Sequence, residues 1–238
     1  MADVGSLSLS EPISGLRYEL KLVCEPHRLA QARSWIRLHP AGFDVAYPPR
    51  RVNSLYLDTP DLSSLGENLA GVSDRQKLRL RWYGDGVRAV EPLLELKQKR
   101  NLLGRKKQVL LPCKLDLTSS WRDILGTVKA CVGLEWRVLL QMADQFTLLN
   151  HYQREYYATP DGALRVTLDY ACAAYDQRLS LRPNLRVPLP VADRVVIEIK
   201  AAPEHVERLQ EAVAQFPAPR TRNSKYAGSF QAGGIGYP

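Results

Sequence analysis

The sequence has few of the residues from which metal sites and covalent catalytic sites are usually built. Its 238 residues include four histidines and four cysteines, and the cysteines are widely spaced, at Cys24, Cys113, Cys131 and Cys172. No Cys-x-x-Cys pair and no cysteine–histidine cluster occurs, so we do not expect a zinc site. No serine lies in a nucleophile-elbow pattern. Isolated cysteines beside apolar stretches are typical of free thiols in a reducing compartment, which predicts a cytoplasmic protein.

Glycine-rich nucleotide loops and long apolar runs are also absent. Residues 104–107, GRKK, lack the spacing and the Ser or Thr of a Walker motif, and the glycines near the C-terminus follow no predicted strand. No apolar run approaches the roughly 18 residues that suggest a membrane-spanning helix, so we expect no membrane span. Residues 1–15 lack the basic and apolar regions of a signal peptide.

Acidic side chains are fewer than basic ones. The chain has 33 Lys and Arg against 25 Asp and Glu, which gives a formal net charge of +8. Its hydrophobic fraction of 45% and charged fraction of 24% are those of a soluble globular protein. The positive excess favours an anionic partner such as nucleic acid, a lipid headgroup or a phosphorylated small molecule.

The basic residues follow a regular pattern. In residues 74–83, DRQKLRLRWY, the cations Lys77, Arg79 and Arg81 alternate with apolar residues, so a strand here has one apolar and one cationic face. Similar alternation recurs in residues 19–22, 94–99, 164–169 and 195–200. For any one strand, a solvated sheet face is an equally good explanation. The five stretches together predict a sheet surface that holds a polyanion.

Most predicted strands follow one another through short connections, which favours an antiparallel, closed or nearly closed barrel with helices outside. Pro48-Pro49 is expected to stop regular structure before a strand at 51–58. Two helices are predicted within residues 118–145, the second with an apolar stripe of Leu134, Val138, Leu139 and Met142. Residues 1–15 and 228–238 are expected to be flexible, which leaves one domain at residues 16–227.

Eight segments in order resemble motifs of the VTC domain: RYELK (17–21), VNSLYLDT (52–59), KLRLRWYG (77–84), LELKQKR (94–100), YQREYY (152–157), LRVTLDY (164–170), VVIEIK (195–200) and NSKY (223–226). The VTC domain is the polyphosphate polymerase module of the vacuolar transporter chaperone complex and belongs to the triphosphate tunnel, or CYTH-like, superfamily. The resemblance implies an α+β fold, an antiparallel eight-stranded β-barrel with helices packed outside and a tunnel lined by Lys and Arg.

The resemblance also implies the site residues. Carried over position by position, it assigns the catalytic phosphate clamp to Arg79, Arg81, Lys97, Arg154 and Arg165. The further phosphate-binding candidates are Lys21, Lys99, Lys200, Arg222 and Lys225, with Lys107 as a plausible addition.

Among the carboxylates, Glu198 is the candidate metal ligand. Hard oxygen ligands suit Mg²⁺ or Mn²⁺, and such ions usually also bind substrate phosphates. A local salt bridge to Lys200 is the alternative for Glu198, and salt bridges are equally plausible for Glu19 and Glu95. Triphosphatases of the superfamily start with an ExExK motif, and Arg17 stands where the first Glu would be. This departure favours the polymerase branch.

The resemblance therefore implies a polyphosphate polymerase that transfers the γ-phosphoryl group of ATP onto a growing polyphosphate chain, which would leave through the far end of the tunnel. Two alternatives remain open: a metal-dependent triphosphatase or nucleoside triphosphatase, and a non-catalytic module that binds polyphosphate or inositol phosphates. A protein that binds double-stranded nucleic acid is a weaker further alternative, because its basic side chains would need to lie on an exposed face. Nucleic acid is therefore not an expected partner. Translocation of the product would require a partner membrane protein, since no span is expected in this chain.

Overall fold

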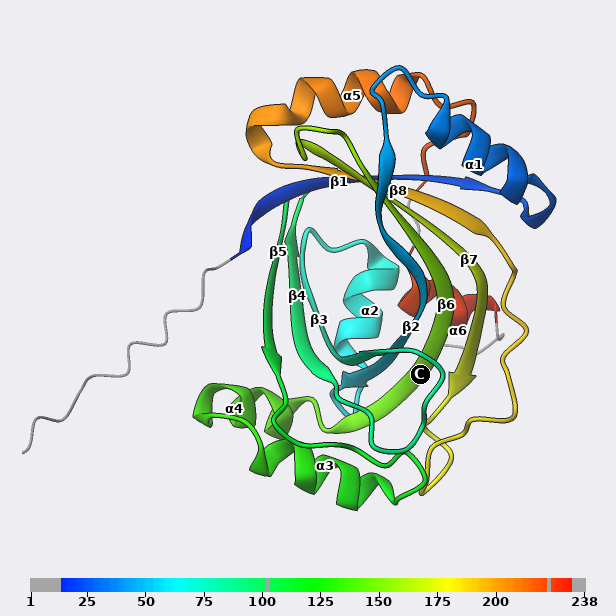
Figure 1. Ribbon diagram of the computed structural model, residues 1–238. Coiled ribbons are helices and arrows are strands. Elements are labelled where there is room, and N and C mark those ends of the chain that lie inside the picture. The colour runs from blue at the N-terminus through cyan, green and yellow to red at the C-terminus, as the bar shows by residue number, and fades with distance from the viewer. Residues whose placement is uncertain (1–13, 102, 222–223, 233–238) are drawn as a thin grey trace, which may run out of the picture.

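The computed structural model describes residues 14–101, 103–221 and 224–232. Eight antiparallel strands form a closed barrel in the order β1-β5-β4-β3-β2-β6-β7-β8, which confirms the predicted fold (Figure 1). The strands are β1 (Ser14–Cys24), β2 (Asp44–Asp58), β3 (Asp74–Tyr83), β4 (Leu93–Arg100), β5 (Leu103–Leu110), β6 (Gln145–Ala158), β7 (Leu164–Asp176) and β8 (Val195–Ala201).

Helices lie on opposite sides of the barrel and across one of its ends. The helices are α1 (Leu29–Arg37), α2 (Ser63–Ala70), α3 (Trp121–Ala130), α4 (Leu134–Met142), α5 (Val206–Ala214) and α6 (Lys225–Ala232), with the 3₁₀ turns η1 (Pro26–Arg28) and η2 (Pro203–His205). Figure 1 shows α1 and α5 outside one side of the barrel, α3 and α4 outside the opposite side, and α2 and α6 within its outline. In the described ranges, no helix combines the length and hydrophobicity needed to cross a membrane.

The apolar faces of the strands point outward, toward the helices. Leu78, Leu80 and Trp82 of β3 pack in one core with Val128 of α3 and Leu140 of α4. A second core, on the opposite side, joins residues of β1, β7 and β8 to α1 and α5. Because side chains alternate along a strand, burying these faces directs the charged faces into the barrel.

A third core lies at one end of the barrel. Tyr56 and Leu148, from β2 and β6, pack here with Leu65 of α2 and with Tyr226 and Phe230 of α6. The two helices therefore cover this end of the barrel, which we call the covered end. The opposite end, where β1 and β7 begin and β8 finishes, is called the rim.

Asp58, the last residue of β2, accepts hydrogen bonds from both helices of the covered end. Its carboxylate accepts hydrogen bonds from the backbone amides of Ser64 (2.9 Å) and Leu65 (3.0 Å) in the first turn of α2. It also accepts one from the hydroxyl of Tyr226 in α6, at 2.7 Å. Asp58 is fully buried, so these donors replace the water that a carboxylate would otherwise bind.

Three expectations about local structure were wrong. Pro48 and Pro49 lie inside β2, in an exposed segment that pairs with β6. This segment precedes the residues of β2 that pair with β3. One edge of the segment is therefore unpaired, and proline is tolerated there because no backbone N–H is needed on that side. Of the stripe predicted for α4, Leu139 packs against the core, but Leu134, Val138 and Met142 are exposed. Trp136 and Leu140 are the buried residues of the helix. Residues 228–232, expected to be flexible, continue α6.

Candidate functional site

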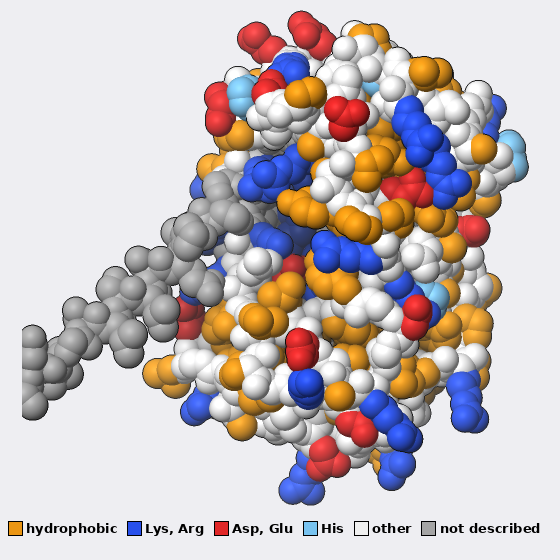
Figure 2. All heavy atoms as spheres, in the orientation of Figure 1, with side chains coloured by type: hydrophobic (Ala, Val, Ile, Leu, Met, Phe, Trp, Pro, Cys, Tyr) orange, Lys and Arg blue, Asp and Glu red, His pale blue; other side chains and the backbone are white. Residues whose placement is uncertain are grey.

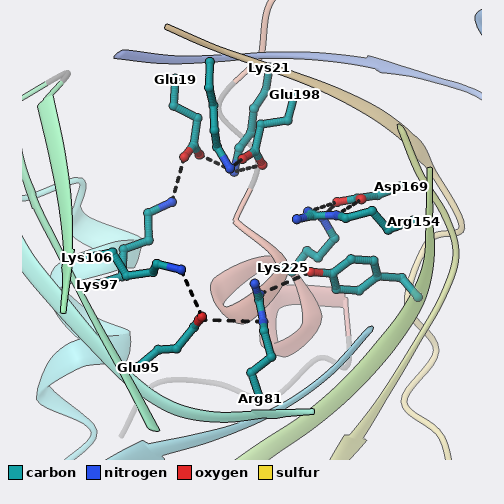
Figure 3. Close-up of polar contacts among 12 residues, drawn as sticks. Glu19, Lys21, Arg81, Glu95, Lys97, Lys106, Arg154, Asp169, Glu198 and Lys225 are labelled. Carbon is teal, nitrogen blue, oxygen red and sulfur yellow. Dashed lines mark hydrogen bonds and ion pairs between the residues drawn. The ribbon is translucent and has the colours of Figure 1, made fainter. Parts of the chain in front are cut away.

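Charged side chains from many elements point into the barrel. Figure 3 shows residues of β1, β3, β4, β5, β6, β7, β8 and α6 directed toward a shared interior. The basic members among the described residues are Lys21, Lys77, Arg79, Arg81, Lys97, Lys106, Arg154, Lys200 and Lys225. They outnumber the carboxylates that pair with them, Glu19, Glu95, Asp169 and Glu198, so the interior has an excess of positive charge.

The first ion-pair cluster surrounds Glu95 of β4. Its carboxylate lies 2.7 Å from Arg79, 3.7 Å from Arg81 and 3.2 Å from Lys106. Glu95 is only 1% exposed. Burial opposes its ionisation, but Arg79, Arg81 and Lys106 outweigh that effect and lower its pKa. This carboxylate therefore stays ionised and fixes the positions of the three cations that pair with it.

In the second cluster, two carboxylates flank one lysine. The ammonium of Lys21 lies 3.1 Å from Glu19 and 3.6 Å from Glu198, and Glu198 also pairs with Lys200. Burial disfavours charge on all of these groups, yet the nearby carboxylates raise the pKa of Lys21, while lysines lower those of Glu19 and Glu198. The salt bridge to Lys200 that was considered for Glu198 is therefore present.

The third cluster joins the barrel to α6. Asp169 of β7 accepts two hydrogen bonds from Arg154 of β6, at 2.6 and 2.7 Å. Lys225, the first residue of α6, lies 2.5 Å from the same carboxylate. Burial opposes charge at Lys225, but Asp169 and Tyr152 raise its pKa. Because one of its cations comes from α6, this cluster connects the covered end to the charged interior.

Burial lowers the pKa of several lysines, among them Lys106, and the effect is largest at Lys97 and Lys77. Lys97 of β4 donates to Glu19 at 2.8 Å, but burial, reinforced by Lys21 and Lys200, lowers its pKa to about 8. Lys77 of β3 donates to the hydroxyl of Ser224 at 2.8 Å, and burial followed by Lys21 and Lys97 lowers its pKa well below the ordinary value. A bound phosphate would favour the charged form of both lysines.

Further cations lie at the rim, where Lys200 of the second cluster is joined by two arginines. Arg17, Arg165 and Lys200 line a pocket of about 230 Å³, together with Asp161 and Glu204. Arg165 is exposed here. Of the five residues assigned to the catalytic clamp, Arg79, Arg81, Lys97 and Arg154 therefore converge in the interior, while Arg165 lies at its entrance.

The remaining candidates divide into four groups. Lys21, Lys200 and Lys225 lie in the interior, as the clusters above show. Lys99 is half-buried, and burial lowers its pKa against the opposing effect of Glu19. Lys107 points outward, where its ammonium pairs with Glu135 of α4 at 2.5 Å, so its inclusion was wrong. Arg222 lies outside the described residues.

The sequence placed Lys77 on the cationic face but not among the assigned site residues, and it did not identify Lys106 or Asp169 as members of the site. Glu95 was considered only for a salt bridge or a metal. Lys77 has the same alternation as Arg79 and Arg81, so the signal for it was present in the sequence. Lys106 stands in a run of three bases, and its inward orientation follows from its pairing with Lys97 across β4 and β5. That pairing is not visible in local sequence.

Few possible metal ligands lie together in the part of the chain that the structure describes. Among the residues that the structure describes, no group of three or more His, Cys, Asp and Glu could hold an ion. Glu19 and Glu198, on either side of Lys21, are ionised oxygen donors of the type that Mg²⁺ and Mn²⁺ prefer. These two carboxylates are the residues that could hold such an ion.

Solved structures of other proteins share this fold. A protein from Hippeastrum, named as a candidate adenylyl cyclase and described as having a dominant triphosphatase activity, is 16% identical, with a TM-score of 0.53 over 92% of this chain and 95% of that one. A candidate adenylate cyclase from Vibrio parahaemolyticus is 14% identical, with a TM-score of 0.48 over 89% of this chain and 95% of its own. No curated protein matches the sequence.

A protein-family model matches nearly all of the predicted domain. The model of the VTC domain matches residues 16–130 and 135–232. The matched ranges include every strand of the barrel except the first residues of β1, and all four carboxylates of the interior. The protein therefore belongs to the VTC domain family.

Proposed function

We propose that this protein is a polyphosphate polymerase, which transfers the γ-phosphoryl group of ATP onto the end of an inorganic polyphosphate chain. The observation that carries the proposal is the convergence of Lys and Arg side chains from most strands on one interior, around the ion-paired carboxylates Glu19, Glu95, Asp169 and Glu198. Membership of the VTC domain family supports it as well. A polyanion with phosphates at regular intervals matches this distribution of cations.

The reaction requires no nucleophile from the protein. An oxygen of the chain's terminal phosphate attacks the γ-phosphorus of ATP, the bond between that phosphorus and the β–γ bridging oxygen breaks, and ADP leaves. Catalysis then consists of in-line positioning and neutralisation of charge. Arg79, Arg81 and Arg154 are suited to hold the transferred group, because Glu95 and Asp169 fix the guanidinium groups in place.

The proposed reaction depends on Mg²⁺ or Mn²⁺, with Glu198 as the main protein ligand and Glu19 beside it. When bound, such an ion would neutralise negative charge on the phosphate groups. Lys21 and Lys200 pair with these carboxylates in the described structure. In the presence of substrate, the same ammonium groups would be available to phosphate oxygens.

A triphosphatase is the second candidate, and the covered end is the observation that favours it. A barrel with α2 and α6 across one end suits a short triphosphate better than a chain that passes through. The Hippeastrum protein, which shares the fold, is described as having a dominant triphosphatase activity. In this reaction water, instead of a phosphate chain, attacks the terminal phosphorus.

The two candidates differ in their products. The purified protein is incubated with ATP and Mn²⁺ or Mg²⁺, and the products are separated on a polyacrylamide gel that resolves polyphosphate by length. The polymerase yields ADP and long-chain polyphosphate in equal phosphate equivalents. Orthophosphate without polyphosphate contradicts polymerisation and identifies the triphosphatase.

Variants connect the product to the interior. Arg81→Met is expected to lower the rate at least about 100-fold, because it removes a cation from the transferred group. Arg105→Met is the matched control, since Arg105 is exposed on β5 and donates to Gln98 at 2.7 Å. Equal rates for the two variants would place the reaction elsewhere.

A further inference from the structure

The loop between β7 and β8, residues 177–194, presents apolar side chains to solvent. Leu179 is 92% exposed, Leu181 is 88% exposed and Val187 is 70% exposed. All three lie within residues 179–187, which we call the loop tip. Single exposed apolar residues are ordinary, but a group of them on one segment marks an interaction surface.

Side-chain hydrogen bonds fix the backbone of the loop tip. The amide oxygen of Asn184 accepts from the backbone N–H groups of Arg186 (3.2 Å) and Val187 (3.0 Å). Its amide nitrogen donates to the backbone carbonyl of Asp176 at 3.2 Å. The backbone N–H of Asn184 donates to the side chain of Gln177 at 2.7 Å. The loop therefore presents its apolar side chains in one defined arrangement.

The loop is joined to the domain on both sides of its tip. The backbone N–H of Trp121, at the start of α3, donates to the carbonyl of Leu181 at 3.1 Å, and Leu185 packs against the core beside α3. Leu189 and Val191 pack against the core of the covered end. Figure 1 shows the loop, in yellow, passing α3 before it follows the outside of the barrel to β8. Some apolar residues of the loop thus complete the cores, whereas those of the loop tip face away from them.

The charge of the loop has one sign. Residues 177–192 contain three arginines and no acidic residue. Arg178 pairs with Asp176 at 2.8 Å, so its charge is already balanced. Arg182 and Arg186 lie in the loop tip and are exposed. Figure 2 shows basic side chains projecting at the lower right of the view, where the loop passes α3. The loop tip therefore combines apolar side chains with positive charge.

A membrane surface that carries acidic lipids matches this chemistry. Leucine and valine side chains can enter the boundary between headgroups and acyl chains, while arginine remains beside the lipid phosphates. Basic residues near such a surface are attracted by its negative potential. The centre of a protein interface is usually enriched in aromatic residues, and residues 179–187 contain none. The loop tip therefore fits a lipid surface better than a protein partner.

We propose that the loop tip docks this protein onto a membrane that contains acidic phospholipids. The side chains of Leu179, Leu181 and Val187 insert at the level of the headgroups, and Arg182 and Arg186 contact lipid phosphates. The loop leaves β7 at the covered end, so the rim stays open to ligands from solution. Docking of this kind is peripheral and reversible, and it does not depend on the reaction proposed above.

Co-sedimentation with vesicles tests the proposal. The protein is mixed with vesicles of phosphatidylcholine alone, or of equal parts phosphatidylcholine and phosphatidylglycerol, and the bound fraction gives a partition constant. The wild type is expected to bind the mixed vesicles at least about tenfold more strongly than the neutral ones. Leu179→Ser/Leu181→Ser is expected to lower binding to the mixed vesicles about tenfold, because insertion is lost. Arg182→Gln/Arg186→Gln is expected to lower it by a similar factor, because attraction to the headgroups is lost.

Matched controls lie beside α1, on the opposite side of the barrel from α3. Leu38→Ser/Val45→Ser removes two other exposed apolar side chains, and Arg28→Gln/Arg37→Gln removes two other exposed bases. The second control lowers the net charge by the same amount as the arginine variant of the loop tip. Both controls are expected to keep vesicle binding within about twofold of the wild type.

The contrary results are equally defined. No binding to the mixed vesicles, equal binding to the neutral ones, or equal losses in the controls and the loop-tip variants would each overturn the proposal. Sedimentation velocity without vesicles detects a different occupant: a dimer that Leu179→Ser/Leu181→Ser converts to a monomer would show that a second copy covers the loop tip. All the substituted residues are exposed, so the variants are expected to fold as the wild type does.

Discussion

At the scale of single residues, the interior is tuned by its carboxylates as well as by its cations. Lys21, between Glu19 and Glu198, has a raised pKa, whereas the pKa of Lys97 is lowered to about 8 although Glu19 also accepts a hydrogen bond from it. The difference arises because Lys97 is buried near Lys21 and Lys200, and each cation disfavours charge on the next. Lysines of the same chemical type therefore respond differently to a bound anion.

Lys97 gives phosphate binding a defined pH dependence. In the free protein Lys97 loses its proton as the pH rises through about 8, while a bound phosphate favours the ammonium and raises the pKa. Triphosphate binding above pH 8 is therefore expected to take up a proton and to weaken as the pH increases. Calorimetry at pH 9, in two buffers with different ionisation enthalpies, measures the uptake.

Lys97→Arg is the matched variant, because arginine stays protonated in this range. Its proton uptake is expected to be smaller than that of the wild type, and equal uptake would contradict the assignment.

Lys97 affects the stability of the protein in the opposite direction: a rise in pH weakens triphosphate binding but increases the contribution of Lys97 to stability. A lysine in the unfolded chain has a pKa of about 10.4. From about pH 8 to that value the unfolded chain binds more protons, so the contribution of Lys97 to the free energy of unfolding increases with pH.

At the scale of secondary structure elements, α6 depends on a few polar contacts. Tyr226 stacks on Tyr56, with ring centres 4.7 Å apart, and its hydroxyl lies 2.7 Å from Asp58 and 3.0 Å from Thr147. Lys225 adds the ion pair with Asp169. The helix is therefore held both by the apolar core of the covered end and by the charged interior.

Removal of one hydroxyl tests this attachment. Tyr226→Phe keeps the ring but leaves the buried carboxylate of Asp58 with one donor fewer, so the free energy of unfolding is expected to fall by about 1–3 kcal/mol. Urea unfolding measures the change. Tyr18→Phe, on the outer side of β1, is the control and is expected to shift stability by less than about 0.5 kcal/mol. Similar losses in the two variants would mean that the hydroxyl does not anchor α6.

The elements also show which features local sequence could predict. The alternation around Lys77, Arg79 and Arg81 predicted both the strand and its inner face, because each apolar residue needed a core. The face of Lys107 could not be predicted in this way, since Arg105, Lys106 and Lys107 are all basic and only pairing with β4 orients them. In α4, Leu and Val occur on several sides of the helix. Periodicity therefore predicted that Leu134 faces the core, whereas Trp136 is the buried residue.

At the scale of the whole molecule, the position of the charges matters more than their sum. The net charge is +8, but part of it belongs to exposed residues such as Lys107 and Lys114, which pair with Glu135 and Glu91. Solvent and salt screen such charges. The interior cations are partly removed from water and act on a ligand at contact distance.

Charge variants separate these two contributions. The double variant Lys107→Gln/Lys114→Gln lowers the net charge by two but leaves the interior unchanged, so tripolyphosphate affinity is expected to stay within about twofold. Lys97→Gln lowers the charge by one and is expected to weaken binding at least about tenfold. Fluorescence competition at fixed ionic strength measures both. A larger loss in the double variant would mean that overall charge controls binding.

Because α2 and α6 lie across one end, the barrel has the form of a cup. A phosphate polymer growing in a cup must move its older units outward, past the same entrance that fresh nucleotide uses. Incoming ATP and outgoing polyphosphate then compete for the open end of the barrel, and the polyphosphate competes more strongly as it lengthens. Under the proposed reaction, the seating of α6, through Tyr226 and Lys225, would determine whether the product stays short or passes through the base of the cup.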